Sequence, residues 1–270
     1  MIKKIISAIL TTVLVLTMVL GVSAESTGNE KLSRDQKIQI LSQRGCPLSS
    51  IENAQDYLID ELLKDEGEFV KVTVQSYDIN KEKKKLEVVS KKEISGDEVS
   101  IQSVMPTNDF QVTTYVERIH EKSGDNFKFT AYGNWNTPPY WCFTDLAALA
   151  WSDNFTLYYD SCTSYGITGL WEDWSPVCPR CNVSVEAGVS HEIPLAKAMI
   201  GQSYTQVAKV YKKDGTGTAN VVADYAHKMV GFGGISAGFT VGGSGIEIGF
   251  SADITVTYDK AMPYYSSFSY

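Results

Sequence analysis

The chain has 270 residues, a formal net charge of -8 at pH 7 and 43% hydrophobic residues. This is enough apolar sequence for one large domain or two smaller ones. An acidic chain is not attracted to phosphates, which argues against nucleic acid as a partner and against attack on membranes in the manner of cationic peptides. Any action on a membrane would therefore depend on the burial of apolar surface.

The first 24 residues have the pattern of a secretory signal peptide. Lys3 and Lys4 precede an apolar run from Ile5 to Leu20, and the small residues before Glu25 form the expected cleavage site. The alternative is a membrane anchor, but the run is near the lower limit of length for a spanning helix. We therefore expect residues 1–24 to be removed and the protein to be secreted (extracellular).

Residues 25–109 are predicted to form a helical region followed by short strands. The sequence SRDQ at Ser33–Gln36 is a capping box that begins one helix. A second helix is expected from about Ser50, with Gly67 as its C-cap, because apolar residues recur there at helical spacing. From Phe69 the period changes to two, which is typical of strands. This region is interpreted as a possible propeptide or shielding segment.

Residues 110–270 are predicted to form a β-rich, Trp-rich, disulfide-stapled domain. The overall fold class is mainly β, with antiparallel hairpins in a sandwich or elongated sheet and a small helical N-terminal region. Asp214-Gly215 lies between two alternating segments and predicts a hairpin turn. The segment Thr144–Trp151 is either a buried strand or a turn of helix, because so short an apolar run does not distinguish the two.

The segment from Ile235 to Tyr258 gives the clearest pattern in the chain. Apolar residues alternate with Ser, Thr and Gly on both sides of Gly242–Gly245. If Val241 faces Ile246, then Phe239 meets Ile248, Ala237 meets Phe250 and Ile235 meets Ala252. All apolar residues then lie on one face of one hairpin.

Two interpretations of this hairpin remain open. A sandwich hairpin with one solvated face shows the same alternation as a strand pair that inserts into a membrane. Small residues on the polar face, rather than Lys and Glu, favour insertion, and Glu247 and Asp253 would then face the lumen. The candidate membrane residues are Ile235, Phe239, Val241, Ile246, Ile248, Phe250, Ile254 and Val256.

The chain has five cysteines, and outside the cell these more often form disulfides than remain thiols. Four of them lie in one central segment: Cys142, Cys162, Cys178 and Cys181. We expect Cys142 to pair with Cys162 and Cys178 with Cys181, although the spacing permits other pairings. Cys46 stands apart as a free thiol or as part of a segment removed on maturation. A zinc site made by the four central cysteines is an alternative.

No sequence motif indicates catalysis. HEIPLA at His191 lacks the second histidine of a zinc-protease motif, and GGSGI at Gly242 is not a nucleophile elbow. The three histidines are far apart in the sequence. We therefore expect no enzymatic activity, no cofactor and no metal.

The tryptophans suggest a second kind of site. Aromatic faces stack on the apolar faces of sugars, and Glu172 and Asp173 lie between two tryptophans. Adjacent carboxylates do not supply the separation that a glycosidase needs, so binding without hydrolysis is the better interpretation. The alternative is that these rings are core residues. The stacking candidates are Trp135, Trp141, Trp171 and Trp174.

Three functions follow from these patterns. The first is a secreted non-enzymatic protein that acts on a target membrane or cell envelope, bacteriocin-like or pore-forming, with homo-oligomers inserting the 235–258 hairpin. The second is an extracellular carbohydrate or cell-wall binding module. The third is a structural matrix protein without a small ligand.

Overall fold

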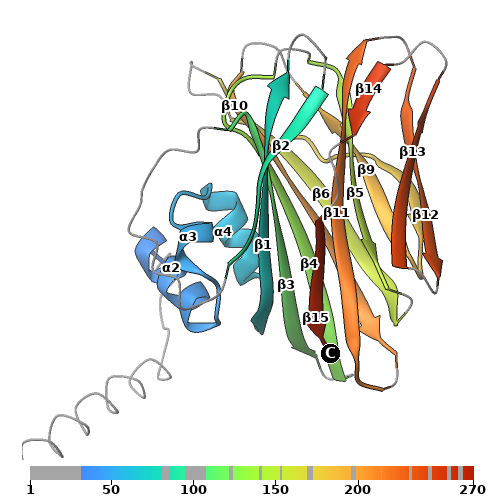
Figure 1. The fold of residues 1–270 in the computed structure, drawn as a ribbon. Coiled ribbons are helices and arrows are strands. Elements are labelled where there is room, and N and C mark those ends of the chain that lie inside the picture. Colours follow the sequence, from blue (N-terminus) through green and yellow to red (C-terminus); the bar gives the residue numbers. More distant parts are fainter. Residues whose placement is uncertain are drawn as a thin grey trace, which may run out of the picture. The chain divides into compact units, whose positions relative to one another are not determined.

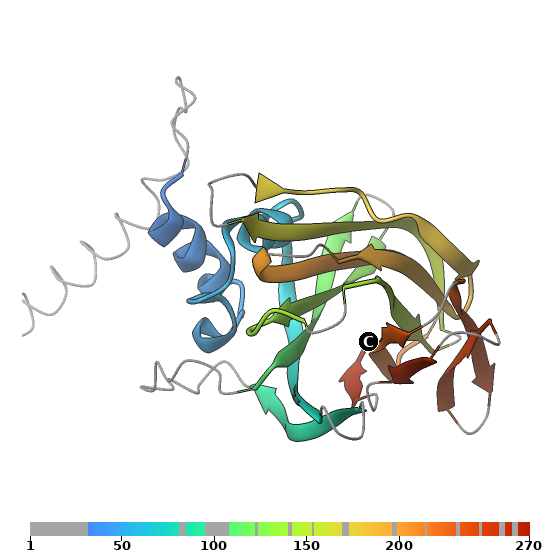
Figure 2. The same ribbon diagram turned by 90° about the horizontal axis from the view of Figure 1, so that it is seen from above.

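The protein is described by a computed structural model. The described residues are 32–80, 85–94, 108–121, 124–139, 142–152, 154–168, 173–195, 199–213, 215–230, 233–242, 245–253, 257–260 and 264–270. Residues 34–270 form one compact unit. Its strands are arranged as an antiparallel β-sandwich, with helices against one sheet and a hairpin against the other (Figures 1 and 2). The mainly β fold class expected from the sequence is confirmed.

The larger sheet, sheet A, has seven strands in the order β2-β1-β3-β4-β10-β6-β7. All of its pairings are antiparallel. The strands are β1 (Gly67–Asn80), β2 (Lys85–Ile94), β3 (Phe110–Glu121), β4 (Gly124–Trp135), β6 (Phe155–Thr168), β7 (Asp173–Trp174) and β10 (Met199–Lys212).

The second sheet, sheet B, has six strands, with the order β14-β11-β5-β9-β8 and with β15 also paired to β11. Its strands are β5 (Thr144–Trp151), β8 (Arg180–Ser184), β9 (Gly188–Pro194), β11 (Thr218–Val230), β14 (Thr257–Lys260) and β15 (Tyr264–Ser269). Segment 144–151 is thus a strand, and it is buried from Asp145 to Trp151. It lies in the centre of sheet B, which explains its continuous apolar run.

The core between the sheets is rich in aromatic residues. Phe127, Phe129 and Trp151 are completely buried there. Trp135 is also buried, and its ring packs 4.5 Å from Phe110 and 5.0 Å from the ring of His227, measured between centroids. The two sheets are therefore held together by a large apolar layer, as in other sandwiches.

The helical segment packs on the outer face of sheet A. It comprises α2 (Arg34–Gln43), α3 (Leu48–Ile51) and α4 (Asp56–Leu63). Its buried apolar side chains contact Val72, Tyr115 and Tyr132 of the sheet. The predicted second helix is thus two short helices, and Gly67 begins β1 instead of capping a helix. A Cβ at Gly67 would lie 2.4 Å from the Arg118 carbonyl oxygen, so glycine permits this close approach.

Two further expectations differ from the structure. Asp214-Gly215 does not close a hairpin, because β10 pairs with β4 and β6 while β11 pairs with β5, β14 and β15. The chain instead crosses from sheet A to sheet B there. β1 and β2 lie in the same sheet as β3, so a division at residue 109 runs through sheet A. Processing of residues 25–109 stays a prediction.

Candidate functional site

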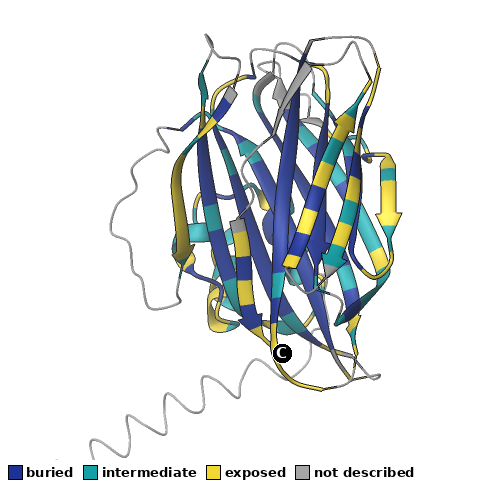
Figure 3. Cartoon of the chain, turned by 45° about the vertical axis from the view of Figure 1, so that its right-hand side comes forward, coloured by how far each residue is buried: buried dark blue, intermediate teal, exposed yellow. Residues whose placement is uncertain are grey.

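The candidate site is the hairpin formed by β12 (Ile235–Gly242) and β13 (Gly245–Ala252). Its observed register pairs Val241 with Ile246, Phe239 with Ile248, Ala237 with Phe250 and Ile235 with Ala252. This is the predicted register. In Figure 3 the strands are banded, because buried or half-buried residues alternate with exposed ones along both.

The apolar face of the hairpin covers the outer face of sheet B. Ile235, Ala237, Ile246 and Ile248 are at most 6% exposed, and Phe239, Val241 and Phe250 are half-buried beside them. Gly188 of β9 leaves room for this contact, since a Cβ there would lie 2.5 Å from the Phe239 ring. The covered residues of sheet B are three alanines, one leucine and one valine: Leu146, Ala148, Ala150, Val222 and Ala226.

The hairpin forms a two-stranded sheet of its own, and its backbone ladder is separate from sheet B. Three side chains of the sandwich bind its backbone. Asn182 Nδ2 donates to the Ala237 carbonyl at 2.7 Å, Tyr265 Oη donates to the Ile246 carbonyl at 2.9 Å, and Cys181 Sγ lies 3.7 Å from the Ile235 carbonyl. Release of the hairpin would therefore break apolar contacts and a few side-chain bonds, while its own ladder stays intact.

The hairpin has the register of the last β11–β14 pair, Val230↔Thr257, which lies beyond a one-residue register shift between Lys228 and Val230. From Val230↔Thr257 to Ile235↔Ala252 both strands advance by the same number of residues. Asp253 N donates to the Gly234 carbonyl at 3.3 Å, which is the same register again. The hairpin and the last β11–β14 pair thus share one register on the two sides of a bend at Gly233 and Gly234.

The bend depends on glycine and on a nearby polar cluster. Gly233 has a φ of 121°, and a Cβ there would lie 2.2 Å from Asp253 Oδ2. Lys228 Nζ donates to the Gly233 carbonyl at 2.5 Å, and Lys228 N donates to Asp145 Oδ1 at 2.8 Å. A cavity of about 270 Å³ lies beside the bend, lined by Thr144, Asp145, Glu192, Lys228, Gly233, Gly234 and Ile235.

The exposed face of the hairpin is polar and mostly small. Ser236, Thr240, Glu247 and Ser251 are exposed on it, and Ser236 Oγ lies 2.8 Å from Ser251 Oγ. Glu247 and Asp253 are both exposed, as the sequence indicated. Of the candidate membrane residues, Ile254 and Val256 lie outside the described residues; the other six share the buried face.

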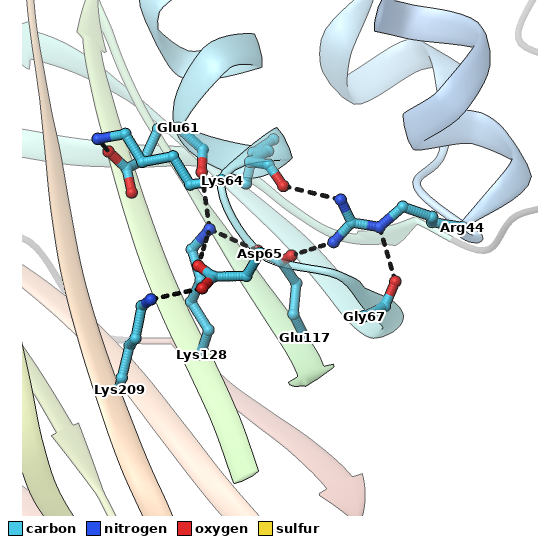
Figure 4. Close-up of polar contacts among 9 residues, drawn as sticks. Arg44, Glu61, Lys64, Asp65, Gly67, Glu117, Lys128 and Lys209 are labelled. Carbon is cyan, nitrogen blue, oxygen red and sulfur yellow. Dashed lines mark hydrogen bonds and ion pairs between the residues drawn. The ribbon is translucent and has the colours of Figure 1, made fainter. Parts of the chain in front are cut away.

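A second cluster joins the helical segment to sheet A through buried charges (Figure 4). Glu117 of β3 and Lys128 of β4 have completely buried side chains, and their charged atoms are 3.6 Å apart. Arg44 Nη2 donates to Glu117 at 2.8 Å and Arg44 Nη1 to the Leu62 carbonyl at 3.0 Å. Lys128 Nζ donates to the Glu61 carbonyl at 2.7 Å. Two cations thus bind carbonyls at the C-terminal end of α4, where the helix dipole favours them.

Asp65 completes this charge cluster. Its carboxylate lies 3.3 Å from Lys128 Nζ and 2.5 Å from Lys209 Nζ. Although partial burial opposes it, contact with the two lysines lowers the pKa of Asp65. Burial raises the pKa of Glu117 to about 7 against the opposing effect of Lys128 and Arg44. The sequence did not indicate this cluster, because its members are dispersed along the chain.

The tryptophan candidates are not brought together as an open site. Trp135 is buried in the sandwich core, so its faces are closed to a sugar, which corrects the prediction for this residue. Trp141 and Trp171 lie outside the described residues. Trp174 is paired with Gly166 through its backbone in β7.

The cysteines differ from the expected pairing. Cys46, Cys162, Cys178 and Cys181 are thiols in the structure. Cys162 lies opposite Cys178 and shares its core cluster, whereas Cys181 packs with the hairpin cluster. Cys142 is half-buried, and its Sγ lies 3.4 Å from the Pro139 carbonyl oxygen.

The histidines and acidic residues of the described segments form no group of three metal ligands. His191 Nε2 lies 3.1 Å from Asp160 Oδ2, and His227 Nδ1 lies 2.7 Å from Asp145 Oδ2, in separate places. Burial lowers the pKa of His191 although Asp160 opposes this. Within the described part of the chain, none of the helices has the length and apolar character needed to cross a membrane.

No protein-family model matches the sequence, and no curated protein matches it. Solved structures show weak likeness. One described as "BspA_C_WT" has a TM-score of 0.32 and 7% identity over 58% of this chain, which spans 58% of the length of that structure. One described as "Pore forming protein" has a TM-score of 0.31 and 8% identity over 72% of this chain and 94% of that one. One concerning Fap1 fimbriae of Streptococcus parasanguinis has a TM-score of 0.27 and 8% identity over 73% and 88%. At these scores the likeness carries no argument about function.

Proposed function

We propose that this protein is a secreted, non-enzymatic protein that acts on membranes by inserting the 235–252 hairpin. The observation that carries the proposal is the register that this hairpin shares with the last β11–β14 pair, Val230↔Thr257. Each hairpin strand alone has 8 residues, slightly fewer than the roughly nine to eleven that a membrane-spanning strand requires. If the bend at Gly233 straightens and the shared register is kept from Val230↔Thr257 to Gly242↔Gly245, each arm spans 13 residues and exceeds that length.

The free energy of releasing the hairpin from sheet B also supports insertion into lipid. Lipid would bury Ile246, Ile248 and Phe250 again, each worth about 1.5–3 kcal/mol. The surface left behind on sheet B comprises three alanines, whose methyl groups cost about 0.8 kcal/mol each to expose, and Leu146 and Val222, which cost about 1.5–3 kcal/mol each. The backbone ladder of the hairpin would be kept throughout. Moving the hairpin from sheet B into a bilayer therefore costs much less free energy than moving it into water.

An inserted hairpin cannot remain alone. Its two outer edges carry backbone groups that would have no hydrogen-bond partners in hydrocarbon, so strands of other copies must pair with them in a closed barrel. Homo-oligomers are thus part of the proposal. The small polar face would line the interior, and the apolar face would contact lipid. The acidic charge of the chain gives no preference for anionic lipid.

Dye release from liposomes tests this proposal. Protein starting at residue 25 is added to vesicles of phosphatidylcholine, with or without phosphatidylglycerol. We expect release by the unaltered protein, strong loss of release for Phe250→Asp, and retained release for Ser251→Asp. The two changes add the same charge to neighbouring positions on opposite faces of β13. Circular dichroism of both variants reports whether they are folded.

Two results would contradict the proposal. One is the absence of release from both vesicle types by folded protein. The other is equal loss of release in the two folded variants, because an inserted hairpin must distinguish its lipid face from its lumen face.

A further inference from the structure

Cys162 and Cys178 occupy directly opposed positions in an antiparallel pairing. Thr163 and Val177 form a β-bridge, and on its two sides Ser164 N donates to the Pro176 carbonyl at 3.1 Å and Cys178 N to the Cys162 carbonyl at 3.0 Å. Opposed residues of a hydrogen-bonded antiparallel pair have Cα atoms about 5.5 Å apart. Disulfides span Cα separations of about 4.4–6.8 Å, most often near 5.5–6 Å.

The two side chains also point into the same space. Cys162 is 2% exposed and Cys178 is 3% exposed, and both belong to the core between the sheets. Besides burial, a hydrogen bond from the Cys162 thiol to Cys178 raises the pKa of Cys162. The other cysteines are placed elsewhere: Cys46 lies under the helices, and Cys181 faces the hairpin.

We propose that Cys162 and Cys178 form a disulfide bond in the mature protein. The oxidant is a protein disulfide of the thiol–disulfide exchange class. One thiolate attacks it to give a mixed disulfide, and the second thiolate then displaces the carrier sulfur. The two cysteines lose two protons and two electrons in total, and the carrier disulfide becomes a dithiol. The bond joins β6 to the segment that leads into β8.

This bond would act chiefly on the edge of the sandwich. Between the two cysteines the chain leaves β6, forms the two-residue strand β7 and returns at Val177. Such a short edge strand contributes few hydrogen bonds to the folded state. A covalent bond between Cys162 and Cys178 would stabilise this edge in another way, by restricting the conformations of the unfolded chain. The proposal is independent of membrane insertion.

Peptide mapping tests the bond directly. Folded protein is incubated with oxidised and reduced glutathione and a disulfide isomerase, alkylated without reduction and digested. Residues 129–179 contain no Lys or Arg, so trypsin leaves Cys142, Cys162 and Cys178 in one peptide that ends at Arg180, and a second protease that cuts after aromatic residues must separate them. We expect a Cys162–Cys178 cross-linked peptide, with Cys46, Cys142 and Cys181 alkylated. Alkylated Cys162 and Cys178, or a bond from either to another cysteine, would overturn the proposal.

Thermal unfolding separates the bond from packing at the same site. A closed loop of about 15 residues predicts a fall in Tm of roughly 5–10 °C when the bond is reduced. We expect this fall when a phosphine reductant is added to the unaltered protein and to Cys142→Ala. The double variant with Cys162→Ala and Cys178→Ala should begin with a lower Tm and be insensitive to the reductant. Equal sensitivity of the double variant would contradict the assignment.

Discussion

Glu117 shows how one residue ties the helical segment to the sandwich at an electrostatic cost. Its side chain is completely buried between Lys128 and Arg44, and burial still raises its pKa to about 7. Buried ion pairs repay their desolvation only when the geometry and the hydrogen bonds are good. Here the two cations also bind helix carbonyls, so Glu117 neutralises groups that hold α4 on sheet A.

The raised pKa of Glu117 predicts a specific pH dependence of stability. The folded protein binds this proton more tightly than the unfolded chain, whose glutamates titrate near 4.5. The Glu117 contribution is therefore fully present below about pH 4.5 and is lost as the pH rises through about 7, with a slope of up to about 1.4 kcal/mol per pH unit. We expect Glu117→Gln to lack this slope in denaturant unfolding measured from pH 4.5 to 8.

The matched control for this prediction is Glu68→Gln, which alters an exposed glutamate on β1. It should keep the slope of the unaltered protein. If Glu117→Gln and the unaltered protein change in parallel between pH 4.5 and 8, then Glu117 does not titrate in this range and the prediction is wrong.

At the scale of elements, the hairpin was predictable because its information is local. Alternation fixes which side chains share a face, and Gly242–Gly245 fixes the register, so the predicted pairs are the observed ones. The same reasoning failed at Asp214-Gly215, because the strands on its two sides belong to different sheets. A turn sequence specifies local backbone geometry and contains no information about which distant strands β10 and β11 find.

The surface that receives the hairpin was also beyond sequence analysis. Ala148 and Val222 are far apart in the chain, and only the pairing of β5 with β11 brings them together. The bend was likewise hidden, since Gly233 and Gly234 resemble any flexible loop. The register shared by the hairpin and the last β11–β14 pair becomes visible only when both sets of pairs are known.

The bend leads to a prediction about Gly233. Its φ of 121° is unfavourable for any other residue, and the added Cβ would meet Asp253 Oδ2 at 2.2 Å. Gly233→Ala should therefore destabilise the docked hairpin by about 1–3 kcal/mol, a factor of roughly 5–150 in the open population. Cys181 reports the change, because its Sγ lies against the Ile235 carbonyl. We expect faster alkylation of Cys181, followed in the peptide 181–197, which contains no other cysteine.

Gly249→Ala provides the comparison for Gly233→Ala. Gly249 lies on the exposed face of β13, and a Cβ there meets no atom within 4 Å. In Gly249→Ala, Cys181 should be alkylated at the same rate as in the unaltered protein. Equal rates in all three proteins would show that the bend at Gly233 does not control docking of the hairpin.

At the scale of the whole molecule, the two sheets carry different kinds of cover. Sheet A is covered by helices that buried charges and apolar contacts hold in place. Sheet B is covered by a hairpin held by apolar contacts and a few side-chain bonds. Release of the helices would remove Arg44 from Glu117 and the Glu61 carbonyl from Lys128, whereas release of the hairpin would expose three alanines, Leu146 and Val222. We therefore propose that the hairpin, and not the helical segment, is the cover that detaches.

This asymmetry predicts how the chain responds to truncation. A protein that begins at Leu32 keeps the Arg34–Asp56 ion pair and all the described helices and strands, so its Tm should stay within a few degrees of the longer chain. A protein that begins at Phe110 lacks β1, β2 and the helices, which exposes the edge of β3, uncovers Lys128 and removes Tyr77 from the core. We expect it to aggregate or to unfold without a cooperative transition, as measured by size-exclusion chromatography and calorimetry. Cooperative unfolding of residues 110–270 at the Tm of the longer chain would show that the helices and first two strands are a removable segment and not part of the folding unit.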